Sequence, residues 1–350
     1  MAVERRLFAT MVSMAFFCVA LPVRSAPVAN EAVPTANGAE NEGILLDDAF
    51  ADNDLIGERK DDGLEFDHTL GEGLKIDPFG ATPHDVVAEM IEFAQIGKDD
   101  IVYDLGSGDG RIPIAAARDR GARGVGIELL PDLVQKSRKS AEEAGVAERV
   151  RFLKQDFFKT DFSEATAILL YLYPRTTIRL RPIFLRQMKP GTRIVAYIYG
   201  IEGWPRDEER PVKRGYGEML YKWIVPANVS GTWKGALTLG PKDERPFELR
   251  LEQTFQQVKG VIRMEDKDIP LRDVALKADA FSFSFTPPGA APLALTGKAT
   301  DDTLRGAIRT ADDDAADRGT WQAKRKPDTK TAIDPGIPET LIKEPAPADD

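Results

Sequence analysis

The sequence predicts an α/β domain with a mostly parallel sheet, followed by a small antiparallel β-domain. Between residues 82 and 199, strongly apolar strand candidates alternate with helix candidates, a pattern typical of a parallel sheet covered on both faces. A glycine-rich turn joins the first of these strands to its helix. After Trp223 the pattern changes to short alternating runs with Gly and charged turns, without a convincing helix, which favours antiparallel strands.

Five strands and four helices are expected in the α/β domain. Thr82-Pro83-His84-Asp85 has the spacing of a capping box, so the first helix is expected to begin there with Thr82 as its N-cap. The strand candidates are 101–105, 124–128, 150–153, 167–172 and 193–199. The later helix candidates are 111–120, 131–144 and 177–188.

The β-domain is expected over residues 227–325, after an α/β domain over 76–226. Phe247-Leu249-Leu251 and Phe281-Phe283-Phe285 each place apolar side chains on one face of a strand. This indicates an up-and-down sheet or a small barrel- or lipocalin-like form. Trp233 and Trp321, near its two ends, are expected in its core because a short barrel is filled by its own side chains.

The N-terminal residues 1–25 have the features of an export signal. Arg5 and Arg6 precede an apolar run from Leu7 to Leu21, and Pro22-Val23-Arg24-Ser25 offers a cleavage point. The run is shorter than the roughly 20 residues of a bilayer span, so no stable membrane span is expected after cleavage. Arg5-Arg6-Leu7-Phe8 also partly matches a twin-arginine signal. A periplasmic or extracellular location is predicted.

Two further segments are expected to be disordered. Residues 26–75 are rich in Ala, Asp, Glu, Asn and Gly with little apolar periodicity, so they cannot bury enough surface to fold. Residues 326–350 contain five prolines and several charges and are predicted to form a tail.

Composition excludes several kinds of site. The net charge of −10 argues against general nucleic-acid binding, which needs a basic face. Arg175, Arg179, Arg181 and Arg186 fall close together and form either a solvated helix face or a local basic patch. The single cysteine, Cys18, lies in the predicted signal, and the two histidines lack metal-ligand spacing. No metal site is therefore predicted.

The informative motif is Val102-Tyr103-Asp104-Leu105-Gly106-Ser107-Gly108-Asp109-Gly110-Arg111. Its glycines permit open dihedrals and a close approach of a ligand to the backbone. The helix that follows presents free N–H groups, which suit a carboxylate. Asp104, at the strand end, is placed to accept hydrogen bonds from an ammonium group. These features fit the amino-acid end of S-adenosylmethionine (SAM).

The main competing interpretation is a nicotinamide site. Its fingerprint is Gly-x-Gly-x-x-Gly, but here the third glycine comes one residue early and Arg111 occupies the expected position. Glu128 ends the second strand, where a carboxylate can accept both ribose hydroxyls for about 1.5–3 kcal/mol each. After the third strand, Gln155-Asp156-Phe157 offers an acid and an aromatic ring for adenine. The three features in order favour SAM.

The stretch from Ala81 to Tyr199 resembles bacterial class I methyltransferases related to the mitochondrial protein-lysine methyltransferases, and more distantly the seven-stranded histone-lysine methyltransferases. It covers about a third of the chain. The matching residues are Ala81-Thr82-Pro83, Asp104 to Arg111, Gly126-Ile127-Glu128-Leu129, Asp156-Phe157-Phe158 and Tyr171-Leu172-Tyr173-Pro174. The resemblance implies a Rossmann-like fold with SAM as cofactor.

The resemblance also implies roles for individual residues. Asp104 and the glycine-rich turn would hold the methionine part of SAM, Glu128 with Leu129 the ribose, and Asp156 with Phe157 the adenine. The residues of the turn are Gly106, Ser107, Gly108 and Gly110. One departure is that those lysine methyltransferases work inside cells or mitochondria, whereas this chain carries the features of an exported protein.

The acceptor is expected at the carboxyl ends of the strands, where open α/β sheets bind ligands. Tyr171, Tyr173 and Pro174 follow the fourth strand and are the candidates for the acceptor pocket, and Tyr197 and Tyr199 end the fifth strand. Tyrosine faces attract an alkylammonium by about 0.5–2 kcal/mol per contact. The alternative is that these tyrosines only pack with their hydroxyls wet. No catalytic base is identifiable.

Three functions remain open from the sequence. The favoured one is a SAM-dependent methyltransferase whose acceptor is a protein amine, with lysine preferred. A second is methylation of a small molecule or lipid. The third is an exported, non-catalytic binding protein that retains the fold, a possibility raised because SAM is made in the cytoplasm.

Overall fold

The structure is a computed structural model that describes residues 69–70, 74–75, 80–310 and 318–336. All of these belong to one compact unit, Asp67–Asp350. The predicted export signal and nearly all of the predicted leader lie outside the described residues. Within the leader, strands β1 (Thr69–Leu70) and β2 (Leu74–Lys75) pair antiparallel. No helix among the described residues has the length and apolar character needed to cross a membrane.

The first domain contains a seven-stranded sheet in the order β5-β4-β3-β6-β7-β9-β8. The strands are β3 (Ile101–Leu105), β4 (Arg123–Glu128), β5 (Val150–Lys154), β6 (Ala167–Leu170), β7 (Arg193–Tyr197), β8 (Glu208–Pro211) and β9 (Met219–Ile224). The pairs among β3 to β7 are parallel, and β9 is antiparallel to both β7 and β8. The predicted mostly parallel α/β sheet is therefore confirmed.

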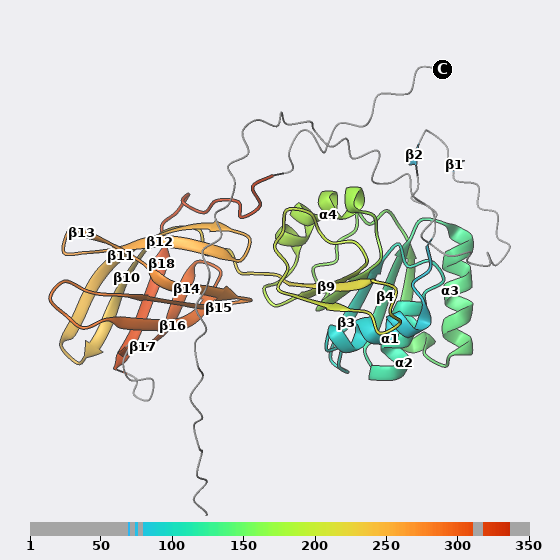
Figure 1. The fold of residues 1–350 in the computed structure, drawn as a ribbon, viewed down its shortest axis with the longest axis horizontal. Coiled ribbons are helices and arrows are strands. Elements are labelled where there is room, and N and C mark those ends of the chain that lie inside the picture. The colour runs from blue at the N-terminus through green and yellow to red at the C-terminus, as the bar shows by residue number, and fades with distance from the viewer. Residues whose placement is uncertain (1–68, 71–73, 76–79, 311–317, 337–350) are drawn as a thin grey trace, which may run out of the picture. The chain divides into compact units, whose positions relative to one another are not determined.

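Helices lie along this sheet (Figure 1). They are α1 (His84–Phe93), α2 (Arg111–Arg120), α3 (Pro131–Glu143) and α4 (Pro174–Gln187), with a short 3₁₀ turn at Ala147–Arg149. Alternate residues of each strand face opposite sides. Val102 and Leu169 pack with α1, whereas Tyr103 and Ile168 pack with α4. This two-residue period explains the unbroken apolar strands, which are buried on both faces.

Several element boundaries differ from the sequence-based expectation. β3 and α2 have the expected bounds, but β6 ends at Leu170 and α4 begins at Pro174. Tyr171 to Tyr173 therefore form a loop rather than the end of a strand. β8 and β9 were not expected. Thr82 is also not the N-cap of α1: Pro83 holds that position, without a side-chain cap.

The strand order creates a switch point beside β3. From β3 the chain moves outward through β4 to β5 and then returns to β6 on the other side of β3. Ligands of open α/β sheets bind outside the carboxyl ends of the strands at such a point. The loops after β3 and β6 are thus neighbours, although more than sixty residues separate them in the sequence.

The second domain is a nine-stranded antiparallel sheet in the order β13-β12-β11-β10-β18-β17-β16-β15-β14. Its strands are β10 (Gly231–Gly240), β11 (Asp243–Thr254), β12 (Gln257–Met264), β13 (Lys267–Pro270), β14 (Arg272–Lys277), β15 (Ala280–Phe285), β16 (Leu293–Thr300), β17 (Thr303–Thr310) and β18 (Gly319–Arg325). Leu271, after β13, donates its N–H to the carbonyl of Gly260 in β12. The sheet is nearly closed into a barrel, which agrees with the predicted form.

The interior of this barrel is packed with side chains. Trp233 and Trp321 are buried, and the ring of Phe283 meets Trp321 edge-on at 5.5 Å between centroids. Trp233 and Trp321 therefore belong to the core, as expected.

The chain continues in an ordered path beyond β18, which the sequence did not predict. Residues 326–336 were assigned to a disordered tail, yet Thr331 donates its N–H to Ser230 and Ile333 is buried. Ile333 also accepts a hydrogen bond from the N–H of Phe255 at 2.8 Å. Backbone partners thus hold this segment despite its polar composition.

Candidate functional site

The glycine-rich turn after β3 is fixed by its neighbours in the sheet. The N–H groups of Gly106 and Ser107 donate to the carbonyl of Ile127 in β4, at 2.8 and 3.0 Å. Gly110 adopts φ 80°, and a Cβ there would lie 2.6 Å from the Phe152 ring. Only glycine fits this position, both for its left-handed backbone and for its close packing.

Asp104 is a buried carboxylate without a donor. Its side chain ends β3 with 4% exposure, and none of the described residues donates a hydrogen bond to it. Burial raises the pKa of Asp104 well above the ordinary value, and the charges of Glu128 and Asp109 raise it further. A buried carboxylate of this kind is costly unless a cation pairs with it, so the position suits an ammonium group of a ligand.

Asp104 and Ser107 both line a small hollow. The Ser107 hydroxyl is buried without a hydrogen-bond partner. Other lining residues include Gly106, Ala81 and Tyr171. Two buried polar groups without protein partners form a site that fits the polar amino-acid end of a cofactor.

An arginine clasp closes one side of this hollow. Arg111 makes a bidentate pair with Asp109, at 2.9 and 2.7 Å, and donates to the carbonyl of Thr82 at 2.8 Å. The segment before α1 is thereby tied to the glycine-rich turn. From the sequence, Arg111 was noted because it stands where a nicotinamide motif has its third glycine. The two-residue spacing of Asp109 and Arg111 was the signal that could have indicated their ion pair.

Glu128 is held at the end of β4 by backbone donors. One carboxylate oxygen accepts from the N–H of Gly108 at 2.9 Å, and the other accepts from Leu129 and Leu130 at 2.8 and 3.0 Å. An ionised carboxylate offers about four acceptor positions, so capacity remains for a ligand hydroxyl. Glu128 therefore also braces the glycine-rich turn, a role that the sequence did not indicate.

Asp156 and Phe157 lie in the turn after β5. One Asp156 oxygen accepts from the N–H of Phe158 at 2.9 Å, and the other lies 3.6 Å from the Lys159 ammonium. Phe157 reaches the glycine-rich turn, since a Cβ on Gly106 would lie 4.0 Å from its ring. The structure thus brings Phe157 next to the turn, while Asp156 makes local contacts.

Four tyrosines form one cluster at the carboxyl ends of β6 and β7. Tyr171 lies 4.9 Å from Tyr197 and 6.2 Å from Tyr199 between ring centroids, and Tyr173 stacks on Tyr199 at 5.4 Å. Tyr171 also lines the hollow of Asp104. The predicted acceptor residues therefore adjoin the predicted cofactor residues. The Arg175 guanidinium lies 5.9 Å from the Tyr173 ring, so this ring already faces a cation.

Tyr197 is buried beneath the cluster. Burial raises the pKa of its phenol, and the neighbouring Glu218 raises it further. The hydroxyl therefore stays protonated at neutral pH and cannot serve as a general base.

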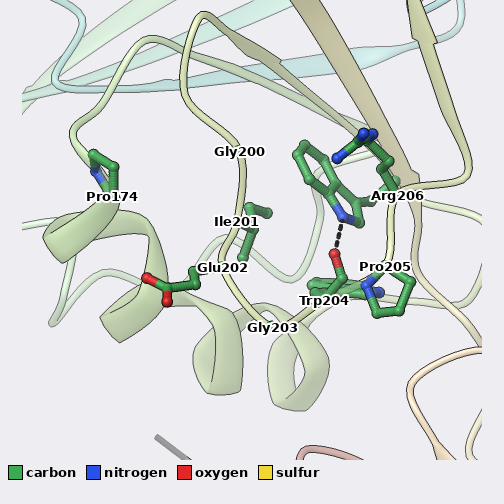
Figure 2. A pocket seen from close by; sticks show the side chains of 9 residues that line it. Pro174, Gly200, Ile201, Glu202, Gly203, Trp204, Pro205 and Arg206 are labelled. Atoms are coloured by element: carbon green, nitrogen blue, oxygen red, sulfur yellow. Dashed lines mark hydrogen bonds between the residues drawn. The ribbon is translucent and has the colours of Figure 1, made fainter. Parts of the chain in front are cut away.

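Figure 2 shows a larger hollow, about 520 Å³ in volume. It is lined by Pro174, the loop from Gly200 to Arg206, and Trp223. Pro174 follows Tyr173 directly, and Gly200 follows Tyr199. The Trp223 indole donates to the carbonyl of Trp204 at 2.9 Å, which fixes one wall. Sequence reasoning missed this loop.

The four arginines near α4 do not form a single patch. Arg175, Arg179 and Arg186 are exposed, but Arg181 is buried and pairs with Asp334 at 2.9 Å. The guanidinium of Arg179 lies 4.3 Å from the ring of Phe158. Arg181 is therefore part neither of a solvated helix face nor of a local basic patch, the two alternatives that the sequence left open.

The family match and the curated relatives indicate the same family of methyltransferases. The family described as the ANTKMT methyltransferase domain matches residues 104–208. A protein-lysine N-methyltransferase of Saccharolobus islandicus is 40% identical over 150 residues, which are 42% of this chain and 93% of that protein. The adenine nucleotide translocase lysine N-methyltransferase of Mus musculus is 30% identical over 108 residues, which are 31% of this chain and 47% of that protein. The chain thus spans about half of this mouse relative.

Among solved structures, an RNA methyltransferase from Salinibacter ruber in complex with S-adenosyl-L-homocysteine is 48% identical. The match covers 41% of this chain and 93% of that chain, with a TM-score of 0.40.

Proposed function

Because the chain belongs to the class I SAM-dependent methyltransferases related to the ATP synthase and adenine nucleotide translocase lysine methyltransferases, we propose that its acceptor is a lysine amine of a protein. The chain is an enzyme and SAM is its cofactor. The non-catalytic binding protein is therefore set aside. The observation that carries the proposal is the tyrosine cluster beside the hollow of Asp104.

The residues at the switch point fit the parts of SAM. We assign the ammonium group to Asp104 and the carboxylate to the hollow between the glycine-rich turn and the start of α2. Glu128 and Leu129 take the ribose, and Asp156 with Phe157 takes the adenine. The bound cofactor supplies a methyl group already activated by a sulfonium, so the protein contributes mainly proximity and alignment.

The tyrosine cluster supports an amine acceptor. The rings of Tyr171, Tyr173 and Tyr199 are half-buried, and they extend from the hollow of Asp104 toward Pro174. An alkylammonium gains about 0.5–2 kcal/mol from each such ring. The attacking amine must be neutral. Because Tyr197 remains protonated, we expect the acceptor to lose its proton to water before transfer.

Labelled-methyl transfer from SAM tests the acceptor class. The full chain after residue 25 is offered a lysine-containing protein, the same protein with its lysines blocked by acetylation, bulk RNA, and small amines. We expect label only on the unblocked protein. Label on RNA or small amines, with none on the protein, would overturn the lysine assignment.

A pair of substitutions at Tyr173 tests the role of the ring. Tyr173→Ala removes the face that meets the cation, and Tyr173→Phe keeps it. We expect the alanine variant to lose about tenfold in kcat/KM for the protein acceptor, since about 1.4 kcal/mol corresponds to tenfold, and the phenylalanine variant to retain most activity. Equal losses in both variants would assign the effect to the hydroxyl instead.

We also propose export, on the basis of Arg5-Arg6 and the apolar run that follows. N-terminal sequencing of the protein from the periplasm of a producing cell tests this, with cleavage after Ser25 as the expected result. Recovery of the uncleaved chain in the cytoplasm alone would contradict it. Transport of the folded, cofactor-loaded protein would carry SAM outward for a single turnover.

A further inference from the structure

The backbone before Tyr199 has an unusual conformation. The N–H of Tyr199 donates to the carbonyl of Tyr197 at 2.8 Å, and Ile198 between them has a φ of 64°. A hydrogen bond that spans two residues across a positive φ is typical of the classic γ-turn, which is rare and strained. Positive φ is also disfavoured for a β-branched residue. Such a conformation persists only where the surrounding structure enforces it.

Strand β9 holds the γ-turn on one side. Ile198 donates its N–H to the carbonyl of Met219 at 2.9 Å, and Tyr197 pairs with Leu220 in the sheet. The side chain of Ile198 packs against the buried cluster that contains Tyr197 and Leu220. The position of the residue before Tyr199 is therefore fixed by a strand that the sequence analysis did not predict.

Helix α4 holds the other side of Tyr199 through Thr177. This side chain is fully buried, and its hydroxyl lies 3.1 Å from the carbonyl oxygens of both Gly200 and Pro174. The N–H of Thr177 donates to the carbonyl of Tyr173 at 3.1 Å. One residue thus contacts the backbone of Tyr173 and the residue that follows Tyr199.

A second residue of α4 holds the same loop one helical turn later. Arg181 donates to the carbonyl of Glu202 at 2.5 Å, and a Cβ on Gly203 would lie 2.6 Å from its guanidinium. Because Thr177 and Arg181 are four residues apart, they lie on one face of the helix. This face of α4 therefore holds two carbonyls of the loop that follows Tyr199.

We propose that Thr177 is a positioning residue for methyl transfer, because it fixes the spacing between the rings of Tyr173 and Tyr199. The proposal rests on the proposed function, in which these rings receive the acceptor amine. Without the hydroxyl, the strained turn at Ile198 can relax and carry the Tyr199 ring away from Tyr173. A displacement of about 1 Å in an aligned site can cost about 100-fold in rate.

The role of Thr177 is expected to be separate from cofactor binding. The hollow of Asp104 is lined by other residues, among them Gly106, Ser107 and Tyr171. A merely structural loss would weaken SAM binding and acceptor turnover together. A positioning role predicts instead that acceptor turnover falls while SAM affinity stays the same.

Three variants of the full chain test this separation. Thr177→Val removes the hydroxyl and keeps the branched shape, whereas Thr177→Ser keeps the hydroxyl. The matched control is Thr192→Val, because Thr192 is also buried and donates its hydroxyl to the carbonyl of Ala165 at 3.2 Å. Thr192 precedes β7, at the opposite end of this strand from the tyrosines.

We expect Thr177→Val to lower kcat for the protein acceptor by about tenfold or more, with SAM affinity by calorimetric titration within about twofold of wild type. Thr177→Ser and Thr192→Val should retain wild-type kcat. Unchanged kcat in Thr177→Val overturns the proposal. An equal loss in Thr177→Ser, or in Thr192→Val, overturns it as well, because the effect would then not depend on this hydroxyl.

Hydrogen–deuterium exchange tests the same contact without SAM or any acceptor. Amides of residues 199–203 should exchange about threefold faster or more in Thr177→Val than in wild type, and at the wild-type rate in Thr192→Val. Equal exchange in all three proteins overturns the hold of Thr177 on this segment. If the wild type methylates no acceptor at all, the proposed function fails, and the exchange result still decides whether Thr177 holds Tyr199.

Discussion

Ligand binding and stability have opposite requirements at Asp104. A buried carboxylate suits an ammonium group of a ligand, but it destabilises the ligand-free protein. Burial raises the pKa of its carboxyl, so the ligand-free folded protein holds the proton more tightly than the unfolded chain does. The contribution of this carboxyl to stability is thus fully present below its ordinary pKa of 3.8 and is lost as pH rises through the raised folded pKa. At neutral pH an ionised Asp104 destabilises the empty protein.

The first prediction follows from the loss of stability that Asp104 causes as pH rises through its raised pKa. Asp104→Asn is expected to raise the melting temperature of the ligand-free protein at pH 8, with a gain that shrinks toward pH 4. The same variant should bind SAM about 10- to 100-fold more weakly, because a charge-assisted hydrogen bond of about 1.5–3 kcal/mol is lost. Thermal melts and calorimetric titration measure both, with the exposed Asp132→Asn as control. A lower melting temperature at pH 8 would contradict the argument.

The second prediction concerns the double role of Glu128. Glu128→Ala removes the acceptor for the N–H groups of Gly108, Leu129 and Leu130, so it should weaken SAM binding tenfold or more and also destabilise the empty protein. Glu128→Gln keeps one acceptor oxygen, so its SAM affinity and its stability are expected to lie between those of the wild-type protein and of Glu128→Ala. Calorimetric titration with denaturant melts would separate the effects. Weaker binding at unchanged stability would mean that Glu128 only contacts the ribose.

At the scale of the elements, the strands and helices of the first domain followed from apolar periodicity. β3 and α2 were predicted to the residue because a buried strand runs into glycines and then into a helix. β8 and β9 were missed. β8 is mostly exposed at the edge of the sheet, and β9 contains Lys222, a buried lysine that interrupts the apolar pattern. Its ammonium lies over the Phe93 ring at 4.4 Å.

The part of the candidate site that lies within one sequence motif was predictable. The part that depends on contacts between residues distant in the sequence was not. Asp104 and the glycine-rich turn are contiguous in the sequence, so local reasoning found them. The hydrogen bond from Arg111 to Thr82 joins residues 29 positions apart, and the pair of Arg181 with Asp334 joins residues 153 positions apart. Nothing local to Arg181 distinguishes it from the exposed Arg179, because only the packed helix shows which side is buried.

The third prediction concerns the clasp. Arg111→Lys keeps the charge but loses the fork that binds Asp109 and the Thr82 carbonyl together. We expect faster amide exchange in the first turn of α1, and SAM affinity weakened by about tenfold. Arg118→Lys, at an exposed pair with Asp119, is the matched control and should change neither. Unaltered exchange in α1 would show that the clasp does not hold this segment.

At the scale of the whole molecule, a turn of the barrel contributes to the core of the first domain. Phe255, between β11 and β12, is buried and stacks on Trp204 at 5.6 Å between centroids. Its φ of 52° is unusual for a residue other than glycine, so its ring is retained at some cost in backbone strain. Gln256 extends the contact by accepting from the Trp204 indole at 3.1 Å and donating to the Pro205 carbonyl at 2.6 Å.

The last prediction follows from this contact. Because Phe255 packs with Trp204 and Ile201 in one cluster, the two domains are expected to unfold in a single transition. Phe255→Ala should cost about 3–5 kcal/mol, as for other buried aromatic residues, and split the denaturant curve into two steps. Tryptophan fluorescence and far-ultraviolet circular dichroism, followed together, would report this splitting. Glu265→Ala, at an exposed turn that also has a positive φ, is the control. A single transition retained by Phe255→Ala would mean that the domains are coupled elsewhere, through Arg181 and Asp334.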